Sequence, residues 1–138
     1  MSIYLRTGKA RDPAPQHQAA AVLTQAAAVA NTWYTVLSVS GNLRVYTVAQ
    51  MMSTAAEDLE IRLTIDGVAY AGAKAGAVAG SWYFYQISGS LALNMQAQDY
   101  REALCEGFVD CRVLLVEVRK TSAAGANTLN GIVHWARW

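Results

Sequence analysis

Charged side chains are scarce in this chain of 138 residues, where they make up 15% of the sequence; an average globular domain has about 25%. The 11 Lys and Arg residues nearly balance the 10 Asp and Glu residues, and the formal net charge is +1. This balance argues against a nucleic-acid partner held by a basic patch and against a polybasic membrane anchor. Because a surface with little charge and almost no net charge favours association, we expect part of it to be covered by a partner.

The residue types that usually carry catalysis are also few. The sequence has two histidines, and His17 and His134 lie far apart along it. It contains no His-Glu-x-x-His motif, no Gly-x-x-x-x-Gly-Lys-Ser/Thr phosphate loop and no Gly-x-Ser-x-Gly elbow. His134 alternates with apolar residues, as a half-buried strand residue would. We therefore predict a protein that is not an enzyme, with no catalytic residue, no metal site and no cofactor.

Long apolar runs are missing as well. No stretch of about 18 apolar residues occurs, so we expect no membrane-spanning helix. Residues 1–18 lack the apolar core of a signal peptide, which makes an intracellular site of synthesis the default expectation. Cys105 and Cys111 are six positions apart, a spacing that fits neither a zinc site nor a redox pair. We expect both to be reduced structural thiols.

What the sequence does contain is a series of strand patterns separated by turn signals. Residues 32–40 are rich in β-branched and aromatic side chains and end at Gly41-Asn42, which we interpret as a turn before a second strand over 43–52. The clearest strand covers 57–66, where aliphatic and polar residues alternate with a period of two. Its aliphatic face consists of Leu59, Ile61, Leu63 and Ile65.

Asp66-Gly67, which follows this strand, favours a type I′ hairpin turn. A return strand is predicted from Val68, followed by a small-residue loop over 71–80. Two strands over 81–88 and 91–96 then follow, joined by a turn at 88–90. The rest of the pattern predicts a short helix over 100–106, a central strand over 111–120, a loop over 121–128 and a last strand over 129–138.

The predicted fold is therefore all-β: an antiparallel β-sandwich, jelly-roll-like, with about eight strands and one short helix. Pro13 and Pro15 exclude regular helix near the N-terminus, so we expect residues 1–18 to form an extended arm and residues 19–138 a single sandwich domain. The Ala-rich segment 19–30 fits either helix or strand. Extended structure is favoured because everything after it is β.

Three carboxylates cluster around the start of the alternating strand. Glu57, Asp58 and Glu60 lie within four positions, and Arg62 follows on the outer face of the same strand. Carboxylates there could bind Ca²⁺ if loops supplied further oxygens. A solvated strand face with Arg62 neutralising its neighbours is the favoured interpretation.

Aromatic residues on the predicted strands supply the candidate contacts. Adjacent pairs such as Trp33-Tyr34 and Trp82-Tyr83 must point to opposite faces, so one of each pair leaves the core. An outward ring on a sheet is either an interface anchor or a ligand platform. With so little surface charge, we favour subunit contacts made by Trp33, Trp82, Tyr85, Trp135 and Trp138. The alternative is a carbohydrate-binding or adhesive module, with Trp82, Tyr83 and Tyr85 forming the platform beside the 71–80 loop.

A family resemblance rests on the segments NTWYTVLSVSGNLRVYTVAQ, EDLEIRLTIDG and SWYFYQIS. An aromatic-led first strand, a Gly-Asn turn and a Leu-Glu-Ile-Arg-Leu strand that ends in Asp-Gly resemble small virion proteins of tailed phages over roughly residues 32–87. The resemblance implies a non-enzymatic capsid decoration (cement) protein, or a tail or fibre component, located in the virion after assembly in the host cytoplasm. It further implies a homo-oligomer, commonly a trimer, whose arm grips the major capsid protein or another virion protein. From the charge balance, we expect no nucleic-acid and no membrane partner.

Overall fold

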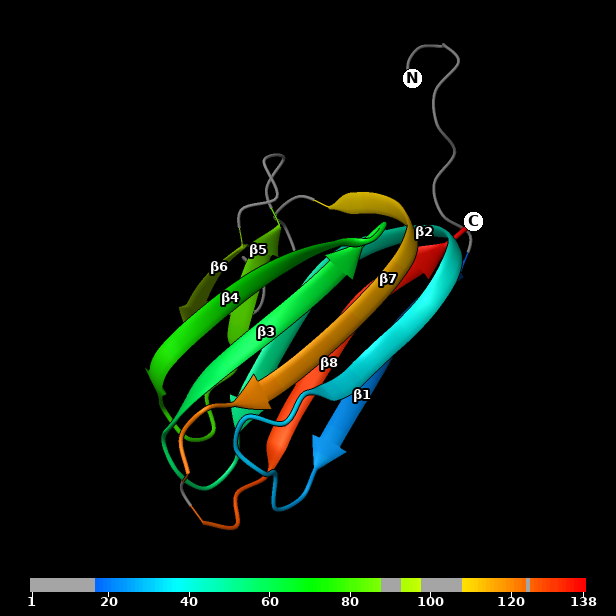
Figure 1. Ribbon diagram of the computed structural model, residues 1–138. Coiled ribbons are helices and arrows are strands. Elements are labelled where there is room, and N and C mark those ends of the chain that lie inside the picture. The colour runs from blue at the N-terminus through cyan, green and yellow to red at the C-terminus, as the bar shows by residue number, and fades with distance from the viewer. Residues whose placement is uncertain (1–16, 88–92, 98–107, 124) are drawn as a thin grey trace.

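The fold was determined from a computed structural model, which describes residues 17–87, 93–97, 108–123 and 125–138. Every regular element in these ranges is a strand, and the eight strands pair antiparallel in one continuous hydrogen-bonded sheet (Figure 1). The predicted all-β class is thus confirmed, and the described ranges contain eight strands. The strands are β1 (His17–Gln25), β2 (Tyr34–Met52), β3 (Glu57–Ile65), β4 (Val68–Ala77), β5 (Tyr83–Ile87), β6 (Leu93–Ala97), β7 (Val109–Lys120) and β8 (Leu129–Arg137).

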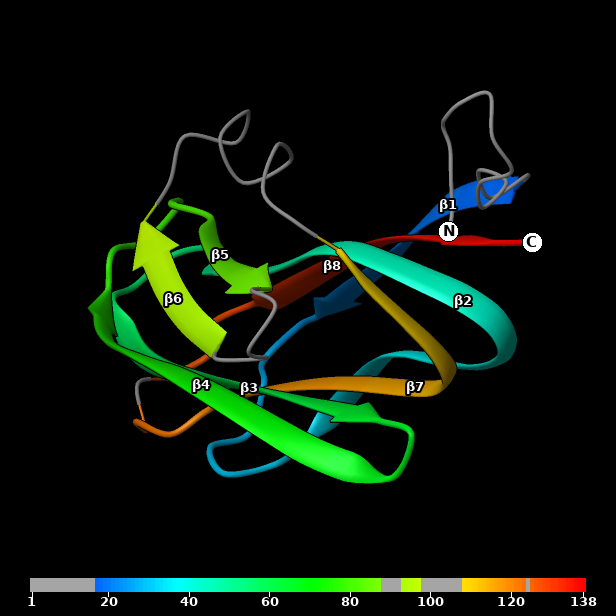
Figure 2. The same cartoon turned by 90° about the horizontal axis from the view of Figure 1, so that it is seen from above.

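The sheet folds over into two layers because β2 belongs to both of them (Figure 2). Residues 34–45 of β2 pair with β7, whereas residues 43–52 pair with β8. One layer therefore has the order β1-β8-β2-β5-β6, and the other has the order β2-β7-β3-β4. With the two halves of β2 counted separately, this is the two-sheet arrangement of a jelly roll, with β6 added at one edge.

The prediction of two strands joined by a turn at Gly41-Asn42 is wrong. The structure has one strand of 19 residues. Gly41 and Asn42 together lie opposite Arg112, and Gly41 has a φ of +133°, a backbone conformation that favours glycine. The same two residues that suggested a turn thus form an irregularity in the pairing, which bends β2 from one layer into the other.

The small-residue segment 71–80 is also different from the expectation of a loop. β4 continues to Ala77, since its backbone pairs with β3 along most of that length. Alanine and glycine have weak strand propensity, but the strongly patterned neighbour β3 supplies the hydrogen bonds that hold them extended. The turn lies farther on, at residues 79–80.

The core lies between the two layers. The four aliphatic residues of β3 that were predicted to share a face are all buried, and the hairpin after them has positive φ at Asp66 (50°) and Gly67 (86°). β7 pairs with both β2 and β3, as expected of a central strand. Fully buried side chains from the three strands β2, β3 and β7 fill the interior, among them Leu43, Val45, Ile61, Leu63, Val116 and Val118.

The N-terminal expectations are met in part. β1 confirms extended structure over 19–25, and it begins at His17, two residues inside the predicted arm. Residues 1–16 of that arm, the predicted turn at 88–90 and the predicted helix over 100–106 lie outside the described residues. The division into an arm and one domain stays a prediction. Among the described residues, none belongs to a helix long and apolar enough to cross a membrane.

Candidate assembly surface

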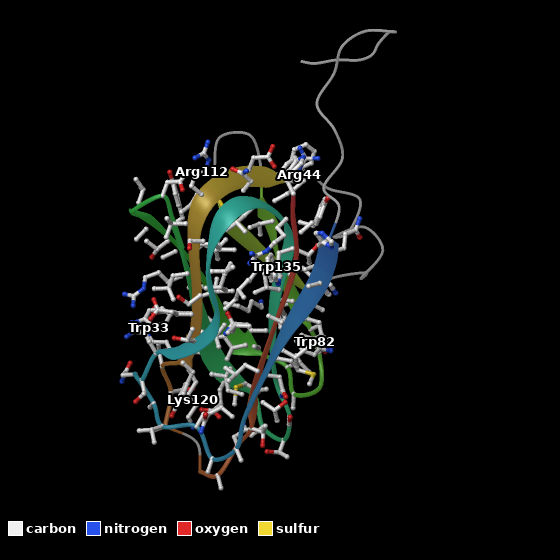
Figure 3. All side chains as sticks on the ribbon, turned by 90° about the vertical axis from the view of Figure 1, so that its right-hand side faces the viewer. Trp33, Arg44, Trp82, Arg112, Lys120 and Trp135 are labelled. Atoms are coloured by element: carbon white, nitrogen blue, oxygen red, sulfur yellow. The ribbon has the colours of Figure 1, made fainter. Side chains whose placement is uncertain are left out.

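The aromatic residues proposed as interface anchors do not share one surface. Trp33, Trp82, Trp135 and Trp138 are all half-buried, and Figure 3 places Trp33 and Trp82 on opposite sides of the view. Tyr85 belongs to β5, where its backbone pairs with Val48; its side chain lies outside the described part of the structure. The structure therefore does not join the five candidates into one patch.

Trp33 lies on the outer face of β3 and β7, between two guanidinium groups. The Arg62 and Arg119 guanidinium carbons lie 4.3 and 4.4 Å from the centre of its ring. Arg62 pairs with Glu117 at 2.8 Å, and Arg119 pairs with Glu60 at 2.6 Å. The expectation that Arg62 neutralises Asp58 and Glu60 is thus wrong, because the cross-strand neighbour on β7 is closer than the same-strand neighbour on β3.

Trp82 and Tyr83 do not form a sugar platform. Trp82 packs against a small second cluster built around Ala49 and Phe84. Tyr83 is 2% exposed, and its hydroxyl accepts a hydrogen bond from the Val78 N–H at 2.8 Å. The platform predicted from Trp82, Tyr83 and Tyr85 thus loses the Tyr83 ring, and most of the 71–80 segment expected to be a loop beside it is strand.

Trp135 and Trp138 lie on and just after β8. Trp135 packs against the edge of the main core. The backbone N–H of Trp138 donates to the Asn42 carbonyl at 3.1 Å, and its ring centre lies 5.0 Å from the Arg44 guanidinium. Trp138 is therefore fixed beside the bend of β2.

Arg44 organises a cluster of rings at this end of the molecule, which we call the Arg44 cluster: Arg44, Tyr46, Phe108, Asp110 and Trp138. Its guanidinium donates to both carboxylate oxygens of Asp110, at 2.7 and 2.9 Å, and this hydrogen bonding raises the pKa of Arg44. The same group lies 3.7 Å from the Phe108 ring centre, and Tyr46 meets Phe108 edge-on at 6.3 Å. Phe108 was not predicted as a contact, because its position directly before a strand gives no sequence signal.

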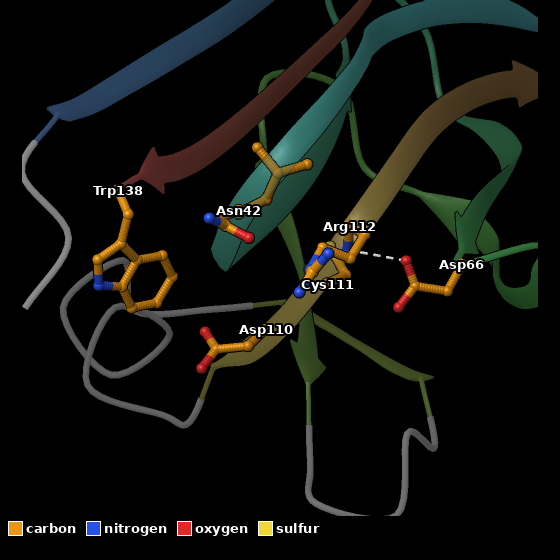
Figure 4. A pocket seen from close by; sticks show the side chains of 7 residues that line it. Asn42, Asp66, Asp110, Cys111, Arg112 and Trp138 are labelled. Atoms are coloured by element: carbon orange, nitrogen blue, oxygen red, sulfur yellow. Dashed lines mark hydrogen bonds between the residues drawn. The ribbon is translucent and has the colours of Figure 1, made fainter. Parts of the chain in front are cut away.

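A hollow of about 500 Å³ opens beside this cluster (Figure 4). Asp66 Oδ1 accepts hydrogen bonds from the backbone N–H groups of Arg112 and Val113 at 2.8 and 2.9 Å, so this carboxylate fixes the β3–β4 hairpin against β7.

Desolvation, with the nearby Asp66 and Asp110 charges, raises the pKa of the Cys111 thiol to about 11. Cys111 is a free, buried thiol, as predicted, and it stays protonated at neutral pH; Cys105 lies outside the described residues. Within the described ranges, no three or more His, Cys, Asp and Glu side chains gather where they could hold a metal ion.

Among the side chains that the structure describes, the most exposed large apolar ones are five valines and Phe108, rather than tryptophans. Their exposed fractions run from 49% to 65%, and they are Val22, Val29, Val68, Val78, Phe108 and Val113. Val22, at 65%, belongs to β1, which pairs with β8 along one edge. No other described strand pairs with the second edge of β1. The sequence pattern favoured large rings as anchors, so β1 was not singled out as a contact surface. Its exposure depends on its place at the end of a layer, which the residue types do not indicate.

Comparison with known proteins gave structural likenesses only. No protein-family model and no curated protein matches the chain. Among solved structures, it is similar to a chain from "Bacillus endospore appendages form a novel family of disulfide-linked pili", with a TM-score of 0.44, 13% identity and 88% of each chain covered. It is also similar to a chain of the infectious bursal disease virus Gx strain (TM-score 0.41, 12% identity, 97% of this chain and 36% of that one). A third likeness is to the cyanophage Pam1 capsid asymmetric unit (TM-score 0.38, 10% identity, 97% and 98% covered). At these values, function has to be argued from the surface itself.

Proposed function

We propose that this chain is a non-enzymatic structural subunit that associates with copies of itself through the free edge of β1, as a decoration (cement) protein of a virion shell. The observation that carries the proposal is the composition of that edge. β1 has nine residues, HQAAAVLTQ, with no Asp, Glu, Lys, Arg or Pro. Strand edges of soluble proteins are commonly protected by such residues or by bulges, because an open edge pairs with other strands.

The edge strand of the other layer provides an internal comparison. β4 pairs with β3 and carries Lys74, and its pairing is interrupted where Gly76 has a φ of +59°. A lysine and an irregularity are two of the usual protections of an edge. β1 has neither, and most of its residues are exposed on both faces. The edge strands β1 and β4 thus differ, and of these two β1 is the one suited to accept another strand.

A second copy of this chain is the partner that the charges favour. With a net charge of +1, copies do not repel one another strongly. Each new backbone hydrogen bond would contribute about 0.5–1.5 kcal/mol, and full burial of a valine about 1.5–3 kcal/mol. Association costs at least about 4 kcal/mol, so one edge gives a modest contact. On a symmetric shell, many such contacts act together.

The oligomeric state of the full chain tests this proposal. Light scattering after size-exclusion chromatography should give an oligomer at micromolar concentration; its mass distinguishes the trimer that the resemblance implies from a twofold dimer. Val22→Lys places a charge on the β1 edge and should give a monomer. Val68→Lys is the matched control, since Val68 is similarly exposed on the protected edge strand β4 and its variant should stay oligomeric. A monomeric parent, or two variants that behave alike, would contradict the role of the β1 edge.

The virion location needs a separate test. We infer it from the resemblance over residues 32–87, with the major capsid protein or another virion protein as the second partner. Portal, protease and major capsid genes next to the gene for this chain, together with its peptides in purified particles, would support the location. Particles that lack the chain would contradict it, and the test of the β1 edge would be unaffected.

A further inference from the structure

Three polar side chains meet in the interior at the end of the sandwich opposite Arg44, where Figure 3 labels Lys120. Lys120 continues the inward-facing row of β7, Glu57 begins the inward-facing row of β3, and Asn127 lies two residues before β8. The side chains of Lys120 and Glu57 are 3% and 0% exposed, and Asn127 is 2% exposed. An ammonium, a carboxylate and an amide are thus enclosed together behind the aliphatic core.

The Glu57 carboxylate contacts both nitrogens. Lys120 Nζ lies 3.2 Å from Oε1 and 3.4 Å from Oε2. Asn127 Nδ2 donates to the same Oε2 at 2.7 Å. One carboxylate oxygen is therefore placed to exchange protons with an amine and with an amide nitrogen.

The Asn127 amide is held by hydrogen bonds at both ends. Its Oδ1 accepts the Thr54 backbone N–H at 2.9 Å and the Thr54 hydroxyl at 2.7 Å. Its Nδ2 donates to the Ala55 carbonyl at 3.0 Å as well as to Glu57. Two donors on a carbonyl oxygen stabilise the negative charge that develops there when a nucleophile attacks the carbon.

We propose that Lys120 and Asn127 condense to an intramolecular amide bond, with Glu57 as the proton carrier. Glu57 takes a proton from the Lys120 ammonium, and the lone pair of the resulting amine forms a bond to Asn127 Cγ. The Cγ–Nδ2 bond then breaks, and the second proton from Nζ passes through Glu57 to the departing nitrogen. Ammonia leaves, either alone or with the first proton as ammonium. No oxidant or other reagent is required.

The fold supplies the conditions for this reaction. The three groups are fixed by strands and by hydrogen bonds, so the reaction becomes intramolecular, and such positioning gives large effective concentrations. Thr54 itself is exposed, but the Asn127 side chain that it binds is 2% exposed, so the oxyanion would develop where little water reaches it. The product is a neutral amide in place of a buried ammonium, and when ammonia leaves alone Glu57 keeps the first proton, so neither charge of the original pair stays buried.

Mass spectrometry of the purified, denatured full chain tests the proposal. The mass should be about 17 Da below that of the unmodified chain, because one ammonia is lost. Trypsin should fail to cleave after Lys120, since its side chain would be an amide, and residues 120–137 should be recovered as one peptide carrying the deficit. Succinimide formation at Asn130-Gly131 also releases ammonia, but it leaves Lys120 cleavable, so cleavage distinguishes the two.

Matched variants assign the roles. Glu57→Gln and Lys120→Arg should each restore the full mass, with folding checked by the β-type circular dichroism spectrum. Glu60→Gln removes a half-buried carboxylate on the outer face of the same strand and should keep the deficit. A folded parent chain of full mass that is cleaved after Lys120 would overturn the proposal. Retention of the bond in Glu57→Gln would overturn the role of Glu57.

Discussion

Gly131 offers the sharpest test of the packing between the two layers. It lies on β8 and is buried. A Cβ at this position would lie 2.7 Å from Val36 Cγ2, and 3.5 and 3.6 Å from the two methyl groups of Val118. Val36 is the extra residue of an irregularity between Thr35 and Leu37; it is half-buried against the core, and its β-branched side chain has few rotamers with which to avoid the contact.

Gly131→Ala should therefore destabilise the fold by about 1–3 kcal/mol, the usual cost of overpacking a core. For a chain of this length, that corresponds to a fall in the melting temperature of roughly 3–10 °C. Gly125→Ala is the matched control. It adds the same methyl group where nothing lies within 4 Å and should leave stability unchanged.

A double-mutant cycle isolates the contact. Val36→Ala alone should cost about 1–2 kcal/mol by lost burial, but in the Gly131→Ala background it relieves the clash. The double variant should be at least about 1 kcal/mol more stable than the sum of the single effects predicts. Chemical denaturation measures all four proteins. Additive effects, or a Gly131→Ala protein as stable as the parent, would refute the proposed packing.

Three further predictions concern titratable groups. Desolvation lowers the pKa of His134 below 6.5, so the folded state favours the neutral ring. The free energy of unfolding should therefore be highest above pH 6.5 and should fall as the pH drops through the pKa of the folded state. His134→Gln should reduce this pH dependence, as measured by chemical denaturation at several pH values. Burial raises the pKa of Cys111 from 9.0 to about 11. The protonated thiol therefore contributes to the free energy of unfolding below pH 9, and this contribution is lost as the pH rises toward 11. In a Cys105→Ser background, alkylation by iodoacetamide at pH 8 should be much slower for the folded than for the unfolded chain, and equal rates would contradict the burial. Asp66→Ala removes the acceptor of two backbone N–H groups and should cost about 1–2 kcal/mol in denaturant titrations; an unchanged midpoint would rule out that role.

Local patterns predicted the parts of the fold that local chemistry determines. The alternation of β3, the Asp66-Gly67 hairpin and the central position of β7 all follow from residue order. The bend of β2 could not be predicted in the same way. Gly41-Asn42 is compatible with a turn and with a bulge, and the choice depends on β7 and β8, which come more than 60 residues later.

The enclosed polar groups show a different reason for a missed feature. Glu57 and Lys120 follow the period of two that marks buried positions on β3 and β7, but Glu57 was interpreted with Asp58 and Glu60 as part of a solvated strand face. Pairing between the adjacent strands β3 and β7 overrides that expectation, because each charge compensates the other. The five aromatic residues stay predicted contacts. Residue type identifies rings that could anchor a partner, whereas the open edge of β1 is a property of strand order.

The position of β2 at the junction of the two layers affects how the chain is made. All three strands that pair with it, β5, β7 and β8, come after it in the sequence. During synthesis, its 19 residues leave the ribosome without any sheet partner, and the last of these partners is complete only when residue 137 has been added. Nascent molecules should consequently need protection by chaperones, and native structure should form slowly and after translation.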